Sequence, residues 1–330
     1  MQCLRNLQNF MINRIWYGAH PLSWVLSPLS YLYRVVVCAR KFYLINFNQK
    51  KCSVPVIVVG NLTVGGVGKT PLVIALAEQF TLRGIKVGIV SRGYKARITN
   101  FPHEVLPTDA AVDVGDEPFL LAKRTAVPVV IAPKRVDAVN YLLDHHQVDI
   151  IISDDGLQHY AMGRAIEIVV IDGTRGLGNQ KCLPAGPLRE PVNRLSTVDF
   201  VVVNTGEWPR AYAMRLVPGP LKTILGEQPT PIEALRSPIA AVAAIGNPQR
   251  FFDLLTDLQL CYRSYIFADH DRLSAEDFKI LEQTVVMTEK DAVKCYEFAT
   301  PLMYFLPVDA VLDDSFWHAL WAHPHLKGYS

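Results

Sequence analysis

The chain has 330 residues, half of them apolar, and its 33 basic and 31 acidic residues give a formal net charge of +2. These values exclude intrinsic disorder, which needs low hydrophobicity and high net charge, and the length indicates about two domains. The overall charge gives no indication of nucleic-acid binding. The cysteines lack the spacing of metal-binding pairs and are typical of buried thiols in a reducing compartment.

The first 50 residues form a basic, aromatic segment. Residues 1–52 contain seven basic residues and no acidic one. Pro21 and Pro28 interrupt the uncharged stretch 15–33, which argues against a simple membrane span. Helical spacing on one apolar face is followed by Leu22, Val25, Leu26, Leu29, Leu32, Tyr33 and Val36. The pattern predicts an amphipathic helix on an anionic membrane surface, and packing against the protein's own core is the alternative.

The body of the chain alternates between strands and helices. Apolar, β-branched runs predict strands at 54–59, 87–90, 127–132, 149–152, 166–171 and 200–203. Helical segments such as 72–83 and 118–123 lie between them, which predicts a doubly wound, mostly parallel sheet. Prolines crowd residues 207–237, and alternation then resumes. We therefore expect a larger α/β domain at 51–212 and a smaller α/β domain at 213–330.

A glycine-rich loop follows the first of these strands. Residues 60–71 read GNLTVGGVGKTP, between a strand and a helix, which is the context of a P-loop. Backbone N–H groups in such a loop bind phosphate oxygens. We therefore expect the sheet to be of the P-loop NTPase type and residues 51–212 to be a P-loop domain. Its nucleotide site is expected to be made by Thr63, Gly65, Gly66, Val67, Gly68, Lys69 and Thr70. Thr63 stands where the usual P-loop spacing has glycine, and a glycine-rich turn that binds nothing is the alternative.

Two adjacent acids end a later strand. Asp154 and Asp155 follow the apolar run at 149–152. A P-loop enzyme needs an acid at such a position to hold Mg²⁺, with the Thr70 hydroxyl as a second ligand. The sequence does not decide which acid binds the metal, and either of them could instead cap a turn.

Seven ordered runs carry a resemblance to a known family. They are GNLTVGGVGKTP (60–71), VSRGY (90–94), VGDEP (114–118), SDDGLQH (153–159), LPAGPLREP (183–191), FADH (267–270) and MTEKDAVK (287–294). Together they resemble the tetraacyldisaccharide 4′-kinases of lipid A biosynthesis, over nearly the whole chain.

The resemblance implies an ATP- and Mg²⁺-dependent kinase that phosphorylates the 4′-hydroxyl of a tetraacylated disaccharide 1-phosphate. It also implies work at the cytoplasmic face of the bacterial inner membrane. No feature identifies a protein partner. The main alternatives are a P-loop switch or metallochaperone NTPase and a membrane-bound nucleotide-binding module. The former often carry a second lysine early in the loop, where this chain has Val64.

The resemblance also implies roles for individual residues. Asp116 corresponds to the family's base and His270 to its partner, with Lys69 acting on the transferring phosphoryl group. Asp116 or Glu117 could instead be a helix N-cap, Asp116 a metal ligand, and His270 a solvated turn residue. Candidate substrate-site residues are Arg92, Arg135, Gln158, His159, Arg189 and Glu190. Each could instead serve an ordinary surface ion pair or cap. The run 288–291 resembles the guanine-reading NKxD motif but lacks its asparagine, so it does not predict guanine recognition.

Overall fold

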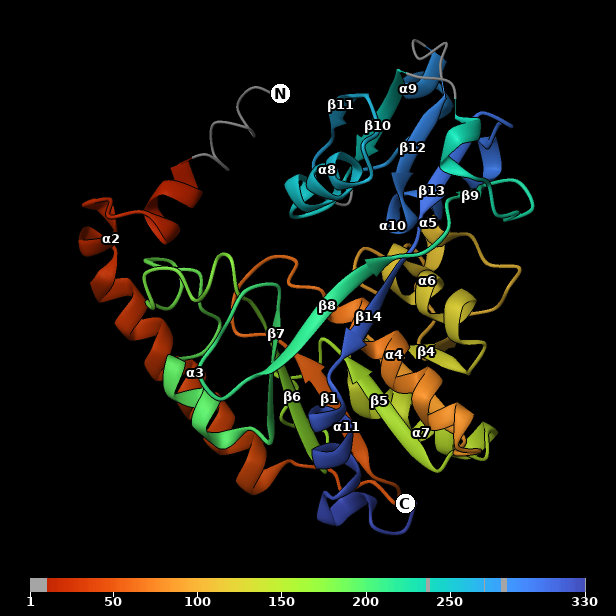
Figure 1. Ribbon diagram of the computed structural model, residues 1–330. Coiled ribbons are helices and arrows are strands. Elements are labelled where there is room, and N and C mark those ends of the chain that lie inside the picture. Colours follow the sequence, from red (N-terminus) through yellow and green to blue (C-terminus); the bar gives the residue numbers. More distant parts are fainter. Residues whose placement is uncertain (1–10, 236–237, 270, 280–283, 330) are drawn as a thin grey trace. The chain divides into compact units, whose positions relative to one another are not determined.

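The computed structural model describes residues 11–235, 238–269, 271–279 and 284–329 (Figure 1). The chain divides into two compact units. The first comprises the described residues up to Lys69, Gln147–Arg215 and those from Leu312 onward, and the second comprises Thr70–His146 and Leu216–Val311. These units group residues that are distant in the chain. The linear boundaries 51–212 and 213–330 stay a prediction.

The first unit contains a run of parallel strands. Their order is β5-β1-β6-β7-β8, and every neighbouring pair is parallel. Their bounds are β1 Val56–Gly60, β5 Ile150–Asp154, β6 Ile166–Asp172, β7 Phe200–Asn204 and β8 Tyr212–Pro218. The first three are buried along their whole length, which is typical of strands covered on both faces. The register pairs Val59 with Asp154, so the polar carboxyl end of β5 lies beside the start of the glycine-rich loop.

Most helices of the first unit lie near the two ends of the chain. They include a turn of helix at 11–17, α2 Leu22–Val25, α3 Ser27–Phe47, α11 Asp314–Trp321 and the 3₁₀ segment η4 Pro324–Leu326, whereas the 3₁₀ segment η1 Val192–Thr197 lies in the middle of the chain. In α11, the Phe316 ring packs edge-on against Phe200 of β7 and Tyr212 of β8. The C-terminal helix therefore covers strands that precede it by about a hundred residues in the chain.

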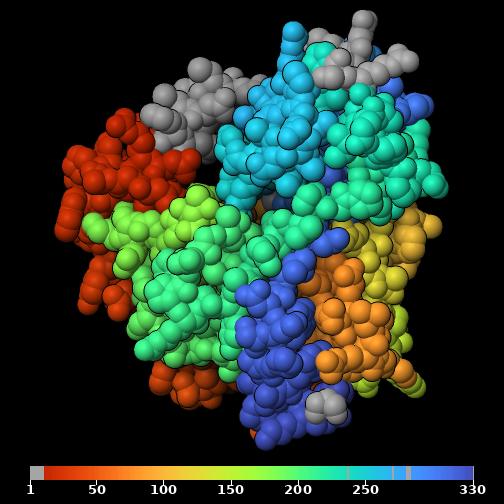
Figure 2. All heavy atoms as spheres, in the orientation of Figure 1, coloured from red at the N-terminus to blue at the C-terminus, as the bar shows by residue number. Residues whose placement is uncertain are grey.

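The amphipathic helix is confirmed, and its apolar side faces outward. Of the seven residues on the expected apolar face, Leu26 and Tyr33 are half-buried and the others are exposed. Ser23 and Ser30 are buried instead, and the Ser30 hydroxyl donates to the Cys182 carbonyl at 2.7 Å. Figure 2 shows α2 and α3 (red) on the visible surface. Across the part of the chain that the structure describes, no helix is long and apolar enough to span a membrane.

The second unit contains two groups of strands. In the first group, β2 (Val87–Ser91) pairs in parallel with β4 (Val129–Ile131), which pairs antiparallel with β3 (His103–Glu104). Its helices are α4 Lys69–Leu82, α5 Ala111–Val114, α6 Asp116–Thr125 and α7 Arg135–His145. The chain crosses between the units after Lys69, after His146, inside β8 and inside β14 (Val308–Leu312).

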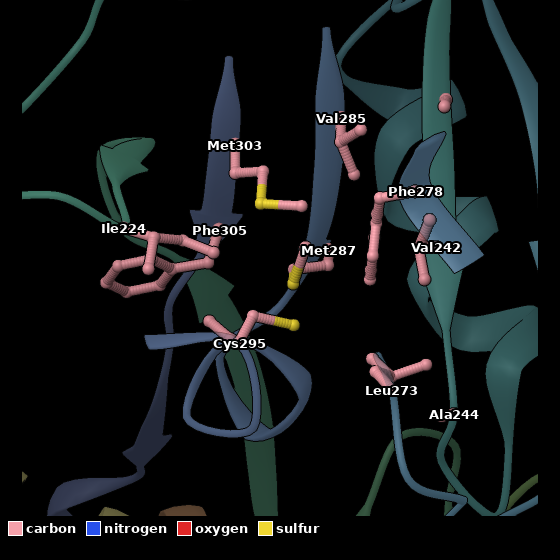
Figure 3. Close-up of a cluster of buried hydrophobic side chains, with 12 residues drawn as sticks. Ile224, Val242, Ala244, Leu273, Phe278, Val285, Met287, Cys295, Met303 and Phe305 are labelled. Atoms are coloured by element: carbon pink, nitrogen blue, oxygen red, sulfur yellow. The ribbon is translucent and has the colours of Figure 1, made fainter. Parts of the chain in front are cut away.

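The other group is a five-stranded sheet of order β11-β10-β12-β13-β9, parallel except for β9. Its elements are β9 Lys222–Thr223, η2 Ile232–Ala234, β10 Ile239–Ala243, α8 Pro248–Asp257, β11 Tyr262–Ile266, α9 Ala275–Lys279, β12 Val285–Thr288, α10 Glu289–Ala292, η3 Tyr296–Phe298 and β13 Met303–Leu306. Figure 3 shows Val242, Met287, Phe305 and Cys295 in the core on one face of this sheet. Burial raises the pKa of the Cys295 thiol, which suits an inert packing role.

The predicted fold class is confirmed: an α/β protein with a mostly parallel sheet and a second, smaller sheet. The predicted strands differ from the observed ones by one or two residues at their ends. The proline-rich segment 207–237 also contains β8, which extends the first sheet beside β7. Met214 is its only fully buried residue, and Arg215 interrupts its apolar side chains, so β8 lacks the continuous apolar run that marks the other strands.

Truncation of Phe316 should strongly destabilise the first unit. The side chain is fully buried between two aromatic rings, so Phe316→Ala leaves a cavity and should cost about 3–5 kcal/mol of unfolding free energy. Urea unfolding measures the change. Leu82→Ala, on a residue that is 79% exposed, is the control and should change stability by less than about 1 kcal/mol. Equal small effects of both changes would contradict the packing described for α11.

Candidate functional site

The glycine-rich loop connects β1 to α4 through two left-handed backbone positions. Gly65 has φ +109° and Gly68 has φ +92°, conformations that side chains other than glycine rarely adopt. A Cβ on Gly68 would also lie 2.3 Å from the Asn204 side-chain nitrogen, whereas one on Gly66 would meet nothing within 4 Å. Gly65 and Gly68 are therefore required by the backbone, and Gly66 leaves open space beside the loop.

A buried asparagine that the sequence analysis missed holds the loop from beneath. Asn61 is fully buried, and its side-chain nitrogen donates to the carbonyls of Thr63 at 2.7 Å and Gly65 at 3.3 Å. Its side-chain oxygen accepts from Lys69 Nζ at 3.1 Å. Asn61 thus holds two loop carbonyls on one side and the lysine ammonium at the loop's end. The only feature of the sequence that could have pointed to this role of Asn61 is its position inside the GNLTVGGVGKTP run.

Asn204 is a second missed residue, at the carboxyl end of β7. It is fully buried, and its side-chain nitrogen donates to the Val67 carbonyl at 2.9 Å. It lies 137 residues from Val67 in the chain, so no local pattern could have identified it. Together with the absent side chain of Gly68, this hydrogen bond keeps the second half of the loop close to the sheet.

The LPAGPLREP segment pairs with the first half of the loop. Val64 N–H donates to the Pro187 carbonyl at 2.9 Å, and Arg189 N–H donates to the Leu62 carbonyl at 2.7 Å. Thr63, which replaces the usual glycine, forms an antiparallel bridge with Leu188. The extended pairing at Thr63 does not need a glycine, so this departure from the usual spacing is compatible with the loop.

The two acids after β5 differ in environment. Asp154 is buried at the end of the strand, whereas Asp155 has φ +46° and a side chain that is 32% exposed. Both Asp155 carboxylate oxygens accept from Arg189 Nη1 at 3.1 Å, and Lys69 Nζ lies 3.5 Å away. The structure therefore brings Lys69, Asp155 and Arg189 together from three separate motifs.

Three further candidates support this group. Gln158 contacts Arg189 at 3.4 Å and donates to Glu190 Oε1 at 2.8 Å. Glu190 is buried and accepts from the Tyr160 hydroxyl, whose pKa is raised by burial and then by Glu190. His159, next to Gln158 and Tyr160 in the chain, is half-buried, and its backbone N–H donates to the Gly156 carbonyl at 2.9 Å. The surface ion pair that was the alternative for Glu190 is wrong, because its carboxylate is buried inside the protein.

In the second unit, Asp116 and Glu117 begin α6. Gly115 occupies the N-cap position with φ +99°, so the alternative in which Asp116 or Glu117 is the N-cap is wrong. Glu117 pairs with Lys290 at 2.7 Å, and Asp116 lies 3.7 Å from Lys294 Nζ. Both lysines belong to the MTEKDAVK run.

Asp269 of the FADH run acts on the same Lys290 charge. His270 itself lies outside the described residues. The Asp271 carboxylate accepts from the Ala268 N–H at 3.0 Å. Burial acts to lower the pKa of Lys290, but the charges of Glu117, Asp269 and Asp116 outweigh it and raise that pKa. Lys290 therefore interacts with acids from both the GDEP and the FADH runs.

The remaining candidates lie elsewhere in the second unit. Arg92 is exposed after β2. Arg135 is buried at the start of α7 and donates to the Ala132 carbonyl at 3.1 Å, so its alternative as a surface ion pair is wrong.

In the 288–291 run, Asp291 is fully buried and accepts from the Ala244 N–H and the Thr288 hydroxyl. Its carboxylate is therefore used inside the protein and is not presented to a guanine base. This agrees with the expectation from the sequence, where the run lacks the asparagine of the NKxD motif. In the described ranges, no three His, Cys, Asp or Glu side chains form a metal-binding group.

A parallel α/β sheet whose first strand leads through a Gly-Lys-Thr loop into a helix defines the chain as a P-loop protein. Residues 22–324 match the family described as tetraacyldisaccharide-1-P 4′-kinase. The chain is 55% identical to the tetraacyldisaccharide 4′-kinase of Legionella pneumophila strain Lens, over 97% of this chain and 99% of that one. It is 46% identical to that of Alcanivorax borkumensis, over 91% and 92%. The chain belongs to the tetraacyldisaccharide 4′-kinase family.

A solved structure supports the same assignment. The crystal structure of the Aquifex aeolicus family member in complex with ATP matches with a TM-score of 0.75 and 26% identity, covering 92% of this chain and 99% of that one. The sequence-based expectation is confirmed: the chain is a tetraacyldisaccharide 4′-kinase of lipid A biosynthesis. The switch, metallochaperone and non-catalytic alternatives are wrong.

The two loop glycines should respond differently to an added methyl group. Gly68→Ala forces a left-handed alanine, at roughly 1–2 kcal/mol, and displaces Asn204. It should lower the melting temperature by several degrees. Gly66→Ala meets nothing and should melt like the wild type. Thermal melting without ligand measures the melting temperature of both variants. The double variant Gly68→Ala with Asn204→Ala should regain only part of the lost melting temperature, because it removes the clash but also the hydrogen bond from Asn204 to the Val67 carbonyl. Equal melting of the two single variants would contradict the loop geometry.

Proposed function

We propose that the loop after β1 binds ATP and that Lys69 acts on its γ-phosphoryl group during transfer to the 4′-hydroxyl of a tetraacylated disaccharide 1-phosphate. The observation that carries this proposal is the position of Lys69, whose ammonium is held by Asn61 at 3.1 Å and Asp155 at 3.5 Å at the end of a preformed loop. A cation at this position stabilises the charge that develops during phosphoryl transfer.

The loop's other residues would bind the phosphates through the backbone. Thr63, Gly65, Gly66, Val67 and Gly68 supply the loop's N–H groups, and α4 begins directly after them. A helix N-terminus adds positive potential to such a site. The complex of the Aquifex aeolicus family member with ATP supports nucleotide binding at this fold.

The residues present fit a magnesium ion. Asp154 is buried at the end of β5, in register with Val59 of β1, and Thr70 follows Lys69 at the start of α4. Carboxylate and hydroxyl oxygens are the donors that Mg²⁺ prefers. Asp154, Asp155 and Thr70 would hold the ion, which would neutralise phosphate charge when bound. Since Asp155 already pairs with Lys69 and Arg189, Asp154 is the better candidate for direct ligation.

Asp116 would act as the general base toward the acceptor. The 4′-hydroxyl loses its proton to the Asp116 carboxylate, the hydroxyl oxygen bonds to the γ-phosphorus, and the bond from that phosphorus to the ADP oxygen breaks. His270 would orient Asp116. The proximity of Asp269 and Asp116 to the same Lys290 charge supports this pairing of the FADH and GDEP runs.

The remaining candidates would bind substrate or support the site. Arg189 is partly exposed beside Asp155, and Arg92 is exposed, so either guanidinium can bind a phosphate oxygen. Gln158 and Glu190 would keep Arg189 in place through the hydrogen bonds described above, with His159 beside them. Arg135 is buried and would hold the start of α7 in position.

Helix α3 would place the enzyme on the cytoplasmic face of the bacterial inner membrane. Its outward face carries Leu29, Tyr31, Leu32 and Phe42, and Trp24 of the preceding helix α2 adds to them, each more than half exposed. Arg34 and Arg40 lie among them and are also exposed. Apolar and aromatic side chains flanked by basic ones favour an anionic lipid surface. A substrate with four acyl chains must be met at such a surface.

Transfer of labelled phosphate from ATP to the tetraacylated disaccharide phosphate tests the chemical roles. Lys69→Ala should nearly abolish transfer, and Asp116→Asn should lower kcat by about 10²–10⁴ while ATP affinity changes little. His270→Ala should lower kcat by no more than Asp116→Asn. The double variant should fall well short of the product of the two effects, because partners that act as a unit are not additive.

Several outcomes would contradict these roles. Near wild-type turnover of a folded Lys69→Ala protein would overturn the loop assignment. Additive losses for Asp116 and His270 would overturn their partnership. A raised Mg²⁺ requirement in Asp116→Asn, relieved by more metal, would make Asp116 a metal ligand.

Reversing the charge on α3 should weaken membrane binding. Arg34→Glu with Arg40→Glu removes two exposed cations, each worth roughly 1 kcal/mol near an anionic leaflet. Co-sedimentation with phosphatidylglycerol-containing vesicles should fall about tenfold or more, and phosphatidylcholine vesicles should show little change. The matched control, Arg83→Glu with Lys86→Glu, makes the same charge change at exposed residues elsewhere. If both variants lose vesicle binding equally, the loss comes from the change in net charge alone, and the role of α3 is contradicted.

A further inference from the structure

The residues of the MTEKDAVK run take no direct part in the proposed phosphoryl transfer, yet their side chains make many contacts. Thr288 is the N-cap of α10 and accepts from the Asp291 N–H. Asp291 is fully buried and accepts from the Ala244 N–H at 2.9 Å and the Thr288 hydroxyl at 2.7 Å. Its other carboxylate oxygen pairs with Lys294 at 2.8 Å. Asp291 therefore fixes α10 and Lys294 to the end of β10.

The charged residues of this run contact both ends of α6. At the N-terminal end, Lys290 pairs with Glu117 at 2.7 Å and Lys294 lies 3.7 Å from the Asp116 carboxylate. At the C-terminal end, Glu289 pairs with Arg124 at 2.7 Å. Three charged residues of one run thus hold a single helix of ten residues at its two ends.

Apolar packing between these elements makes the ion pairs specific. Val293, which follows α10, is buried against Leu120 of α6 and Ala111 of α5, with Tyr296 and Phe119 packed against this cluster. The Lys294 side chain is only 7% exposed, and the Asp116 side chain is 15% exposed. Because water screens such a pair weakly, the lysine charge acts more strongly on the carboxylate than a surface pair would.

We propose that Lys294 is a positioning residue for the kinase reaction, which holds the Asp116 carboxylate in place and in its charged form, and that Lys290 holds Glu117 beside it. This inference rests on the proposed role of Asp116 as the base. Charged groups next to this pair on the described elements are Asp291 and Lys290 on α10 and Glu117 on α6, and Asp269 acts on Lys290. The TEKDxxK pattern thereby acquires a function that differs from base recognition.

The pH dependence of kcat separates this role from simple structural support. Asp116 acts as a base only when ionised, and a nearby ammonium favours the ionised form. In Lys294→Gln, the acidic limb of the kcat–pH profile should move to higher pH by about one pH unit. At neutral pH, kcat should fall by about ten- to a hundredfold because the carboxylate is less well held, with the KM for ATP unchanged. Lys294→Arg keeps the charge and should retain the wild-type profile.

The matched control lies on the same helix. Lys123, near the C-terminal end of α6, pairs with Glu227, so Lys123→Gln also removes one ion pair that holds α6. It should leave the kcat–pH profile unchanged. Since Lys294 also neutralises buried Asp291, Lys294→Gln is compared with the double variant Lys294→Gln with Asp291→Asn, which leaves no buried charge unpaired at that position. Both should show the same displaced acidic limb.

The outcomes distinguish this inference from the role of Asp116. If Asp116→Asn is inactive and the folded Lys294 variants keep the wild-type profile and kcat, the positioning role is overturned and the base is retained. If Asp116→Asn is fully active, both are overturned. In the Asp116→Asn background, Lys294→Gln should cause no further loss of kcat, and an undiminished loss there would overturn the inference.

Discussion

The contact of the Lys69 ammonium with the Asn61 side-chain oxygen and the Asp155 carboxylate is the interaction on which the loop that we propose for ATP depends. It exists because β5 lies beside β1 in parallel, so that their carboxyl ends meet at one edge of the sheet. Asn61 leaves the end of β1 and Asp155 leaves the end of β5, and Lys69 returns to both through a loop with two left-handed glycines. A lysine held in this way is oriented before any phosphate arrives, which lowers the cost of ordering it on binding.

In the second unit, ion pairs orient the carboxylates at the start of α6. Helix α6 starts with two carboxylates at its positive end, where the helix dipole favours them. The dipole alone cannot decide where a carboxylate points. Lys290 of α10 and Lys294, two residues after that helix, supply that direction, while Glu289 holds the opposite end of α6 through Arg124. The buried pair of Lys294 and Asp291 makes α10 a fixed support and not a solvated turn.

Helix α3 shows how one helix can pack through its polar side. Small serines allow it to lie close to the 182–190 segment, where Ser30 donates to the Cys182 carbonyl and Tyr33 to the Arg189 carbonyl. Its large apolar side chains are then left facing outward. Exposed apolar patches of this kind mark interaction surfaces. The same 182–190 segment pairs with the phosphate loop, so the helix that we propose for the membrane is tied to the loop that we propose for ATP.

By itself, the sequence determined the α/β class, the phosphate loop and the family, because continuous apolar strands, a Gly-Lys-Thr turn and seven ordered motifs are local patterns. The helical period of α3 was equally clear, but not which side of it would be buried, since that depends on the serines' partners around Cys182 and Lys181. Only the tertiary structure decided that Asn204 supports the loop, that β8 extends the first sheet and that Lys294 lies beside Asp116. These contacts join residues more than a hundred positions apart, or follow from packing between elements, and neither residue of such a pair carries a local signal of the other. Local propensity and spacing determine elements and motifs, whereas the partner of each buried polar group is decided by which elements the fold brings together.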